Sequence, residues 1–144
     1  MRLTLNGLKD YAKRFVDELP RSAMSSAHMI GLSGELGAGK TTFVQFVAKE
    51  LGILGNVSNP TFVIAKSYAI AHPVFRKLIH VDAYRLSKSD PDTLGWRELM
   101  RDPAHLILVE WSENLADFPE SAPRVSFTVI GEGVREVNES SSTS

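Results

Sequence analysis

The chain has 144 residues, which is the size of one ordinary domain and enough to bury a hydrophobic core. Its 16 Lys and Arg residues against 17 Asp and Glu residues leave a formal net charge of −1, which does not favour a strongly basic nucleic-acid binder. Cysteine is absent, so disulfides, thiolate metal sites and cysteine nucleophiles are excluded.

The N-terminal part of the sequence predicts a short strand followed by an amphipathic helix. Arg2–Leu5 alternates between polar and apolar residues, and a stripe of apolar residues then recurs at helical spacing. Asn6 is the expected N-cap, and Pro20 marks the end of the helix. The residues of the stripe are Leu8, Tyr11, Ala12, Phe15, Val16 and Leu19.

The most informative segment is Gly34–Thr41, which completes the phosphate-binding pattern G-x-x-x-x-G-K-[ST]. Glycines in such a loop let successive backbone N–H groups face an anion without a clash of Cβ atoms. Lys40 supplies a positive charge for the β- and γ-phosphates, and the Thr41 hydroxyl is a hard oxygen ligand for Mg²⁺. The sequence therefore predicts a site for a nucleoside triphosphate.

The segments on either side of the loop agree with this prediction, because the motif requires a strand before it and a helix after it. The apolar run Met29–Ser33 predicts a buried strand. The helical spacing that follows the loop predicts a helix that runs to Leu51, with Gly52 as its C-cap glycine. The residues expected to contact the nucleotide in this segment are Glu35, Gly37, Ala38, Gly39, Lys40, Thr41 and Thr42.

Two β-rich runs, Thr61–Tyr68 and Val74–Val81, come next in the chain and are joined by a short connection around His72–Pro73. This arrangement predicts an antiparallel pair of strands. A helix is then expected over Pro91–Met100, because proline is favoured at the first position of a helix.

The last third of the chain predicts more strands. His105–Glu110 is apolar until its final acid, which is typical of a central buried strand. Val125–Ile130 alternates and predicts another strand, and a glycine-rich turn leads to a short segment at Val134–Val137. Together the elements predict a single-domain α/β P-loop nucleotide-binding fold, with a mixed, mostly parallel sheet flanked by helices. We expect the domain to span residues 1–137 and the polar tail 138–144 to be disordered.

Two acids follow apolar runs and are candidates to work with the phosphate loop. Asp82 ends the run Leu78–Val81, and Glu110 ends the run Leu106–Val109. Ordinary solvation of a strand end explains either acid alone equally well. Ligands, however, collect at the carboxyl ends of strands in open α/β sheets, where two carboxylates can divide metal binding and water positioning.

Other candidates have plainer alternatives. Thr61 lies on the loop after the phosphate-loop helix and could sense the γ-phosphate, although a turn threonine explains it as well. Arg85 could neutralise charge in a transition state or could simply stack on Tyr84. Trp111 is interpreted by residue type alone as a core or surface anchor. The histidines have no metal-binding spacing, and we interpret all of them as incidental: His28, His72, His80 and His105.

Taken together, these residues resemble the bacterial TsaE (YjeE) family, small ATPases of the threonylcarbamoyladenosine (t6A) modification of tRNA. The resemblance covers most of the chain. It depends on four blocks that occur in this order: Gly34–Phe43, Asn59–Phe62, His80–Leu86 and Val109–Trp111. Such an ordered set is far more specific than the phosphate loop alone.

The resemblance implies an ATPase that binds ATP and Mg²⁺ and acts with two partner proteins, TsaB and TsaD, with tRNA contacted indirectly through that complex. It suggests Thr41 and Glu110 as the metal ligands and Asp82 as the acid needed for hydrolysis. Thr61 matches the threonine of the family's Ser-Pro-Thr element, and Trp111 matches the tryptophan beside the metal-binding glutamate. Both are therefore expected to contact the nucleotide.

In the resulting mechanism, Lys40 and the loop amides stabilise charge on the transferred phosphoryl group, and Asp82 orients or deprotonates the attacking water. Two alternatives remain open, a small-molecule P-loop kinase and a non-catalytic nucleotide-gated binding module. The scattered arginines argue against the arginine-rich lid of a kinase. The sequence shows neither an apolar stretch of the about 18 residues that a membrane span needs nor a signal peptide, so we expect a cytoplasmic protein.

Overall fold

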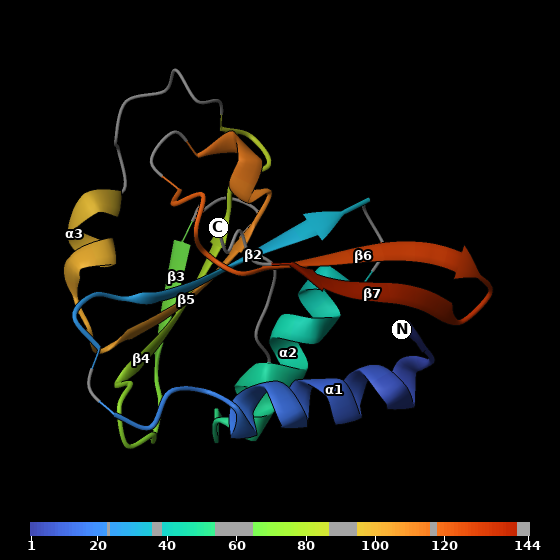
Figure 1. Ribbon diagram of the computed structural model, residues 1–144. Helices are drawn as coiled ribbons and strands as arrows, with labels where there is room; N and C mark the ends of the chain where they lie inside the picture. Colours follow the sequence, from blue (N-terminus) through green and yellow to red (C-terminus); the bar gives the residue numbers. More distant parts are fainter. Residues whose placement is uncertain (23, 36–38, 54–64, 87–94, 116–117, 141–144) are drawn as a thin grey trace.

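A computed structural model of the chain describes residues 1–22, 24–35, 39–53, 65–86, 95–115 and 118–140 (Figure 1). In chain order its elements are β1 (Arg2–Leu3), α1 (Leu5–Asp17), β2 (His28–Gly34), α2 (Lys40–Glu50), β3 (Ala65–Ala69), β4 (Lys77–Asp82), α3 (Trp96–Arg101), β5 (His105–Glu110), the 3₁₀ helix η1 (Ser112–Asn114), β6 (Arg124–Gly131) and β7 (Val134–Ser140).

The described strands form one mixed sheet in the order β1-β7-β6-β2-β5-β4-β3. β2 pairs in parallel with β5 and β6, and β5 pairs in parallel with β4. Antiparallel pairs close both edges, β3 with β4 on one side and β7 with β6 and β1 on the other. The expected mixed α/β sheet is confirmed, with its parallel strands at the centre. The carboxyl ends of β2, β4 and β5 therefore meet at one edge of the sheet.

Helices cover both faces of this sheet (Figure 1). One face carries α1 and α2, which pack on each other and on Leu78, Leu106 and Leu108. The other face carries α3, whose Trp96 belongs to the same buried cluster as Ile107. Because both faces are covered, β5 is buried along its whole length, as its apolar sequence predicts. Within the described ranges, no helix has the length and apolar character needed to cross a membrane.

Helix α1 begins earlier than the sequence indicates. Its N-cap is Thr4, whose side-chain oxygen accepts a hydrogen bond from the backbone N–H of Gly7 at 3.2 Å. The prediction of Asn6 as N-cap was wrong, because Asn6 already lies inside the helix. Both residue types cap helices well, so local preference does not choose between them. The choice is made by packing, which buries Leu8 and Tyr11 against the sheet.

The middle of the chain agrees with the prediction where it is described. β3 pairs antiparallel with β4, as expected, while the first residues of the predicted strand, Thr61–Ile64, lie outside the described residues. The helix expected over Pro91–Met100 is described only from Gly95 onward. Gly95 itself is not helical, because it has φ 66° and precedes the first residue of α3.

The C-terminal strand continues beyond the expected end of the folded part. β7 runs to Ser140, and Asn138, Glu139 and Ser140 each pair with a residue of β6. These three residues were expected in a disordered tail because they are polar. Backbone pairing with β6 orders them despite that composition. The rest of the predicted tail, residues 141–144, lies outside the described residues.

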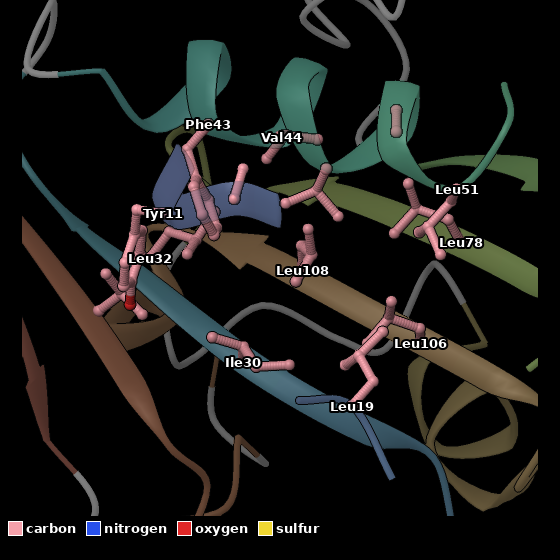
Figure 2. Close-up of a cluster of buried hydrophobic side chains, with 14 of the residues drawn as sticks. Tyr11, Leu19, Ile30, Leu32, Phe43, Val44, Leu51, Leu78, Leu106 and Leu108 are labelled. Carbon is pink, nitrogen blue, oxygen red and sulfur yellow. The ribbon is translucent and has the colours of Figure 1, made fainter. Parts of the chain in front are cut away.

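An aromatic cluster joins α1, α2 and the sheet. The ring of Phe43 on α2 is fully buried, and its centroid lies 5.6 Å from Tyr11, 5.4 Å from Phe15 and 5.6 Å from Phe127. Figure 2 shows Phe43 and Tyr11 between the helices and the sheet, close to Leu32. Phe43 lies in the first turn of α2, so this packing also fixes the start of the helix.

We expect Phe43→Ala to lower the free energy of unfolding by about 4 kcal/mol, because it leaves a cavity in this cluster. Urea denaturation followed by tryptophan fluorescence measures the change. The control is Lys49→Ala on the exposed side of the same helix, which should change stability by less than about 0.5 kcal/mol. Similar stability of the two variants would contradict the packing described for Phe43.

Candidate functional site

The carboxyl ends of three central strands and the first turn of α2 meet at one edge of the sheet. β2 ends at Gly34, β4 at Asp82 and β5 at Glu110. Asp82 and Glu110 are direct neighbours in the β4–β5 register. The described chain resumes at Gly39, and α2 begins at Lys40. The strand before the predicted phosphate loop and the helix after it are therefore confirmed.

Two glycines of the loop have backbone requirements that only glycine meets easily. Gly34 has φ 138°, and a Cβ atom there would lie 2.3 Å from the carbonyl oxygen of Phe127 on β6. Gly39 has φ 109°. L-residues rarely adopt this region, and a clash with backbone cannot be relieved by turning a side chain. Gly34 thus lets the chain leave β2 while β6 stays paired beside it.

Lys40 is buried at the base of the loop, with an exposed fraction of 3%. Its Nζ donates a hydrogen bond to the carbonyl oxygen of Gly34 at 2.5 Å and lies 3.9 Å from the ring centroid of Trp111. Burial lowers the pKa of Lys40 from its ordinary value, and nearby acids, Glu110 foremost, oppose that change. The ammonium group is therefore held at this edge of the sheet by a carbonyl, an aromatic face and carboxylates.

Glu110 and Thr41 bring oxygen atoms together beside Lys40. The Thr41 hydroxyl donates toward both carboxyl oxygens of Glu110, at 3.1 and 3.2 Å. Hydroxyl and carboxylate oxygens are ligands of the kind that Mg²⁺ prefers. Among the described residues no group of three His, Cys, Asp or Glu side chains forms a metal cage. This donor set fits Mg²⁺, which commonly takes one or two protein oxygens and completes its shell with phosphates and water.

His80 is a site residue that the sequence interpretation missed. It is fully buried, and its Nε2 lies 2.5 Å from Oε2 of Glu110. Its Nδ1 has no partner among the described residues, so the contact with Glu110 is the only hydrogen bond of the ring there. The interpretation of His80 as incidental was wrong. The sequence did hold one signal. Side chains alternate along a strand, so His80 lies on the same face of β4 as the candidate acid Asp82.

Asp82 stands at the more open side of the site. It is half-buried, and its Oδ1 accepts a hydrogen bond from the backbone N–H of Tyr84 at 3.0 Å. That bond orients the carboxylate at the start of a turn. Unlike Glu110, Asp82 therefore presents its carboxylate where water can reach it. Arg85 is exposed on the same turn.

The turn after β5 is tied to both neighbouring strands. The backbone N–H of Trp111 donates to the carbonyl of Leu32 on β2 at 3.1 Å, and Ala83 N–H donates to the carbonyl of Glu110 at 3.0 Å. Asn114 in η1 donates its side-chain amide to the carbonyl of Ala83 at 2.9 Å. These bonds hold the turn over the ends of β2, β4 and β5.

Trp111 occupies an unusual backbone position within this turn. It has φ 60°, and among the described residues it is the only non-glycine residue with positive φ. Such conformations cost about 1–3 kcal/mol and concentrate at functional sites. The result is that its ring covers Lys40 and packs against the ring of Tyr84, with centroids 5.1 Å apart. Trp111 thus lies beside Lys40 of the phosphate loop, and its predicted contact with the nucleotide stays a prediction.

The remaining expected nucleotide contacts divide into two groups. Glu35 is exposed after the end of β2, and Thr42 is half-buried in the first turn of α2. Gly37, Ala38 and Thr61 lie outside the described residues, so their predicted roles remain predictions.

Comparison with known proteins matches this chain to one family by a family model and by individual relatives. The family model for "Threonylcarbamoyl adenosine biosynthesis protein TsaE" matches residues 5–137. A tRNA threonylcarbamoyladenosine biosynthesis protein TsaE from Haemophilus influenzae is 36% identical over 106 residues, which cover 72% of this chain and 63% of the relative. The protein of the same name from Streptomyces coelicolor is 41% identical over 95 residues, which cover 62% and 60%. The matched part thus spans less than two thirds of the length of these relatives.

A solved structure has the same arrangement of elements. The crystal structure of Bacillus subtilis YdiB superimposes with a TM-score of 0.70 and 26% sequence identity. The match covers 99% of this chain and 84% of that chain.

We expect His80→Leu to lower the free energy of unfolding by about 3 kcal/mol, because it leaves the buried carboxyl of Glu110 without one of its partners. His80→Gln can restore a donor near the same place and should recover part of the loss. Urea denaturation of both variants measures the difference. Equal losses would show that the volume of the side chain matters rather than its contact with Glu110.

Proposed function

Because the chain belongs to the family of threonylcarbamoyl adenosine biosynthesis protein TsaE, we propose that it is a Mg²⁺-dependent ATPase that serves the t6A modification of tRNA. The observation that carries the ATPase proposal is one contact. The phosphate-loop Thr41 meets a buried Glu110 at the carboxyl end of the neighbouring strand, 3.1 Å away. Lys40 lies beside this pair, so charge neutralisation and metal binding are available in one place.

In the proposed complex, Lys40 and the N-terminal amides of α2 bind the β- and γ-phosphates. The Lys40 ammonium exchanges its bond to the Gly34 carbonyl for bonds to phosphate oxygens, which bind a cation more strongly than a carbonyl does. Glu35, Gly37, Ala38, Gly39 and Thr42 line the same loop in this proposal. Trp111 covers the Lys40 ammonium and limits the access of water to it.

Thr41 and Glu110 are the residues that would hold Mg²⁺. When bound, the metal neutralises charge that develops on the phosphate oxygens. His80 holds one carboxyl oxygen of Glu110, which leaves the carboxylate in a fixed orientation toward Thr41. A hydrogen bond from a neighbouring residue to a metal ligand orients that ligand toward the ion.

Asp82 is proposed to handle the attacking water. The water oxygen forms a bond to the γ-phosphorus, the bond to the β–γ bridging oxygen breaks, and ADP leaves with that oxygen. Asp82 orients the water and accepts its proton. Its half-exposed position next to Glu110 suits this role, since the carboxylate faces solvent rather than the core. Thr61 is proposed to sense the γ-phosphate from its own loop.

The partners of this ATPase are proposed to be TsaB and TsaD, with tRNA reached through their complex in the cytoplasm. The support is the family, whose name refers to threonylcarbamoyl adenosine biosynthesis. Hydrolysis is proposed to reset the partner complex rather than to modify tRNA directly, and the support for this step is the family resemblance.

We expect Asp82→Asn to lower the kcat of ATP hydrolysis by about 10²- to 10³-fold, because it removes the base while keeping the shape of the side chain. The affinity for ADP should stay within about twofold of the wild-type value. Phosphate release, with and without TsaB and TsaD, measures the first quantity, and calorimetry measures the second. Asp17→Asn, on the exposed end of α1, is the matched control and should behave as wild type.

Three results would contradict this proposal. Unchanged turnover in Asp82→Asn would remove the assigned role of Asp82. Label transfer from ATP to a small acceptor in place of phosphate release would indicate a kinase. ATP binding without any turnover by the wild type, even with partners, would indicate a nucleotide-gated binding module.

We expect Glu110→Gln to raise the Mg²⁺ concentration for half-maximal hydrolysis at least about tenfold, because an amide oxygen binds Mg²⁺ more weakly than a carboxylate. Titration of phosphate release with Mg²⁺ at saturating ATP measures this. Glu50→Gln, an exposed acid at the carboxyl end of α2, is the matched control. An unaltered Mg²⁺ requirement in Glu110→Gln would rule out Glu110 as a metal ligand.

A further inference from the structure

Arg135 on β7 lies against the phosphate loop, although it is far from the loop in the sequence. A Cβ atom placed on Gly39 would lie 3.5 Å from Cδ and 3.6 Å from Nε of Arg135. Gly39 immediately precedes Lys40, so the Nε end of the Arg135 side chain lies beside this part of the loop, where Leu8 of α1 also approaches within 3.6 Å of the same position. Neither its residue type nor its place near the end of the chain indicated this in the sequence.

The guanidinium of Arg135 is also incompletely bonded. Its Nη1 is buried and has no hydrogen-bond partner among the described residues. A buried donor without an acceptor costs free energy, and the cost is larger for a charged group. A cation with an unused N–H donor beside the predicted phosphate loop is suited to donate a hydrogen bond to an oxygen of a bound anion. Arg135 thus lies next to the phosphate loop and has no role in the function proposed above.

The position of Arg135 indicates which part of a nucleotide it would meet. In the sheet, β2 has β5 and β4 on one side and β6 and β7 on the other. Glu110 and Asp82, with which Lys40 interacts, end the strands on the first side, so the γ-phosphate and its metal belong there. Arg135 lies on the second side. A triphosphate that runs across the loop therefore points its α-phosphate toward Arg135.

We propose that Arg135 binds the α-phosphate of the nucleotide and thereby lets the site distinguish a nucleotide from shorter phosphate anions. A guanidinium group presents paired N–H donors that match phosphate oxygens. The proposal rests on the proposed function, since it requires that the loop binds a nucleoside di- or triphosphate. In this placement Arg135 contacts the α-phosphate and not the reacting γ-phosphate, so we expect it to contribute to affinity and not to the chemical step.

The test is a titration of Arg135→Ala with ADP, a non-hydrolysable ATP analogue and pyrophosphate. We expect ADP and the analogue to bind about tenfold or more weakly than to the wild type, with pyrophosphate affinity unchanged, because pyrophosphate can fill the loop without reaching Arg135. The kcat at saturating ATP should remain within about twofold. Arg135→Lys should recover part of the affinity, because it restores the charge without the planar group.

The matched control is Arg76→Ala, an exposed arginine next to the amino end of β4 at the opposite edge of the sheet, which should bind all three ligands as wild type does. Unchanged ADP affinity in Arg135→Ala, with wild-type binding intact, would overturn this inference alone. Lost kcat with unchanged ADP affinity would also overturn it, because it would place Arg135 at the γ-phosphate. A wild type that binds neither ADP nor the analogue would overturn the proposed function together with it.

Discussion

Both the packing of the fold and the geometry of the candidate site depend on the carboxyl group of Glu110. With 3% of its surface exposed, Glu110 must find partners inside the protein, because an unpartnered buried carboxyl is costly. Thr41 supplies one from the first turn of α2, and His80 supplies the other from β4. The helix after the phosphate loop is thereby fastened to two central strands. A displacement of α2 would break the bonds from Thr41 and leave the carboxyl with His80 alone.

Alternation along β4 and β5 explains how polar groups reach this buried position. Leu78 and Leu106 face α1 and α2 near the amino ends of the strands, where Figure 2 shows them in the core. Their alternate neighbours, such as Ile107, face α3 instead. Continuing the first row toward the carboxyl ends leads to His80 and Glu110. Along each strand, the side chains of this row thus change from hydrophobic core to functional site over two residues, from Leu78 to His80 and from Leu108 to Glu110.

Sequence patterns predict the central part of this arrangement well. The phosphate loop, the buried β5 and the acids at the strand ends follow from local spacing, and the family resemblance is confirmed by the match over residues 5–137. His80, Arg135 and the backbone of Trp111 could not be placed in the same way. Their roles depend on strand order and register, which bring together residues distant in sequence. Likewise, the cap at Thr4 and the extension of β7 are decided by packing and pairing rather than by residue preference.

The sheet order also has a consequence for biosynthesis. β2, which leads into the phosphate loop, lies between β5 and β6, and the edge strand β1 pairs with β7. β1 therefore acquires its partner strand only after β7 has been made. On a ribosome, α1 and α2 would emerge while five of the seven described strands are still missing, so their apolar faces would be uncovered. Such long-range pairing slows folding, so the apolar faces of α1 and α2 stay exposed at least until the later strands of the sheet have been made.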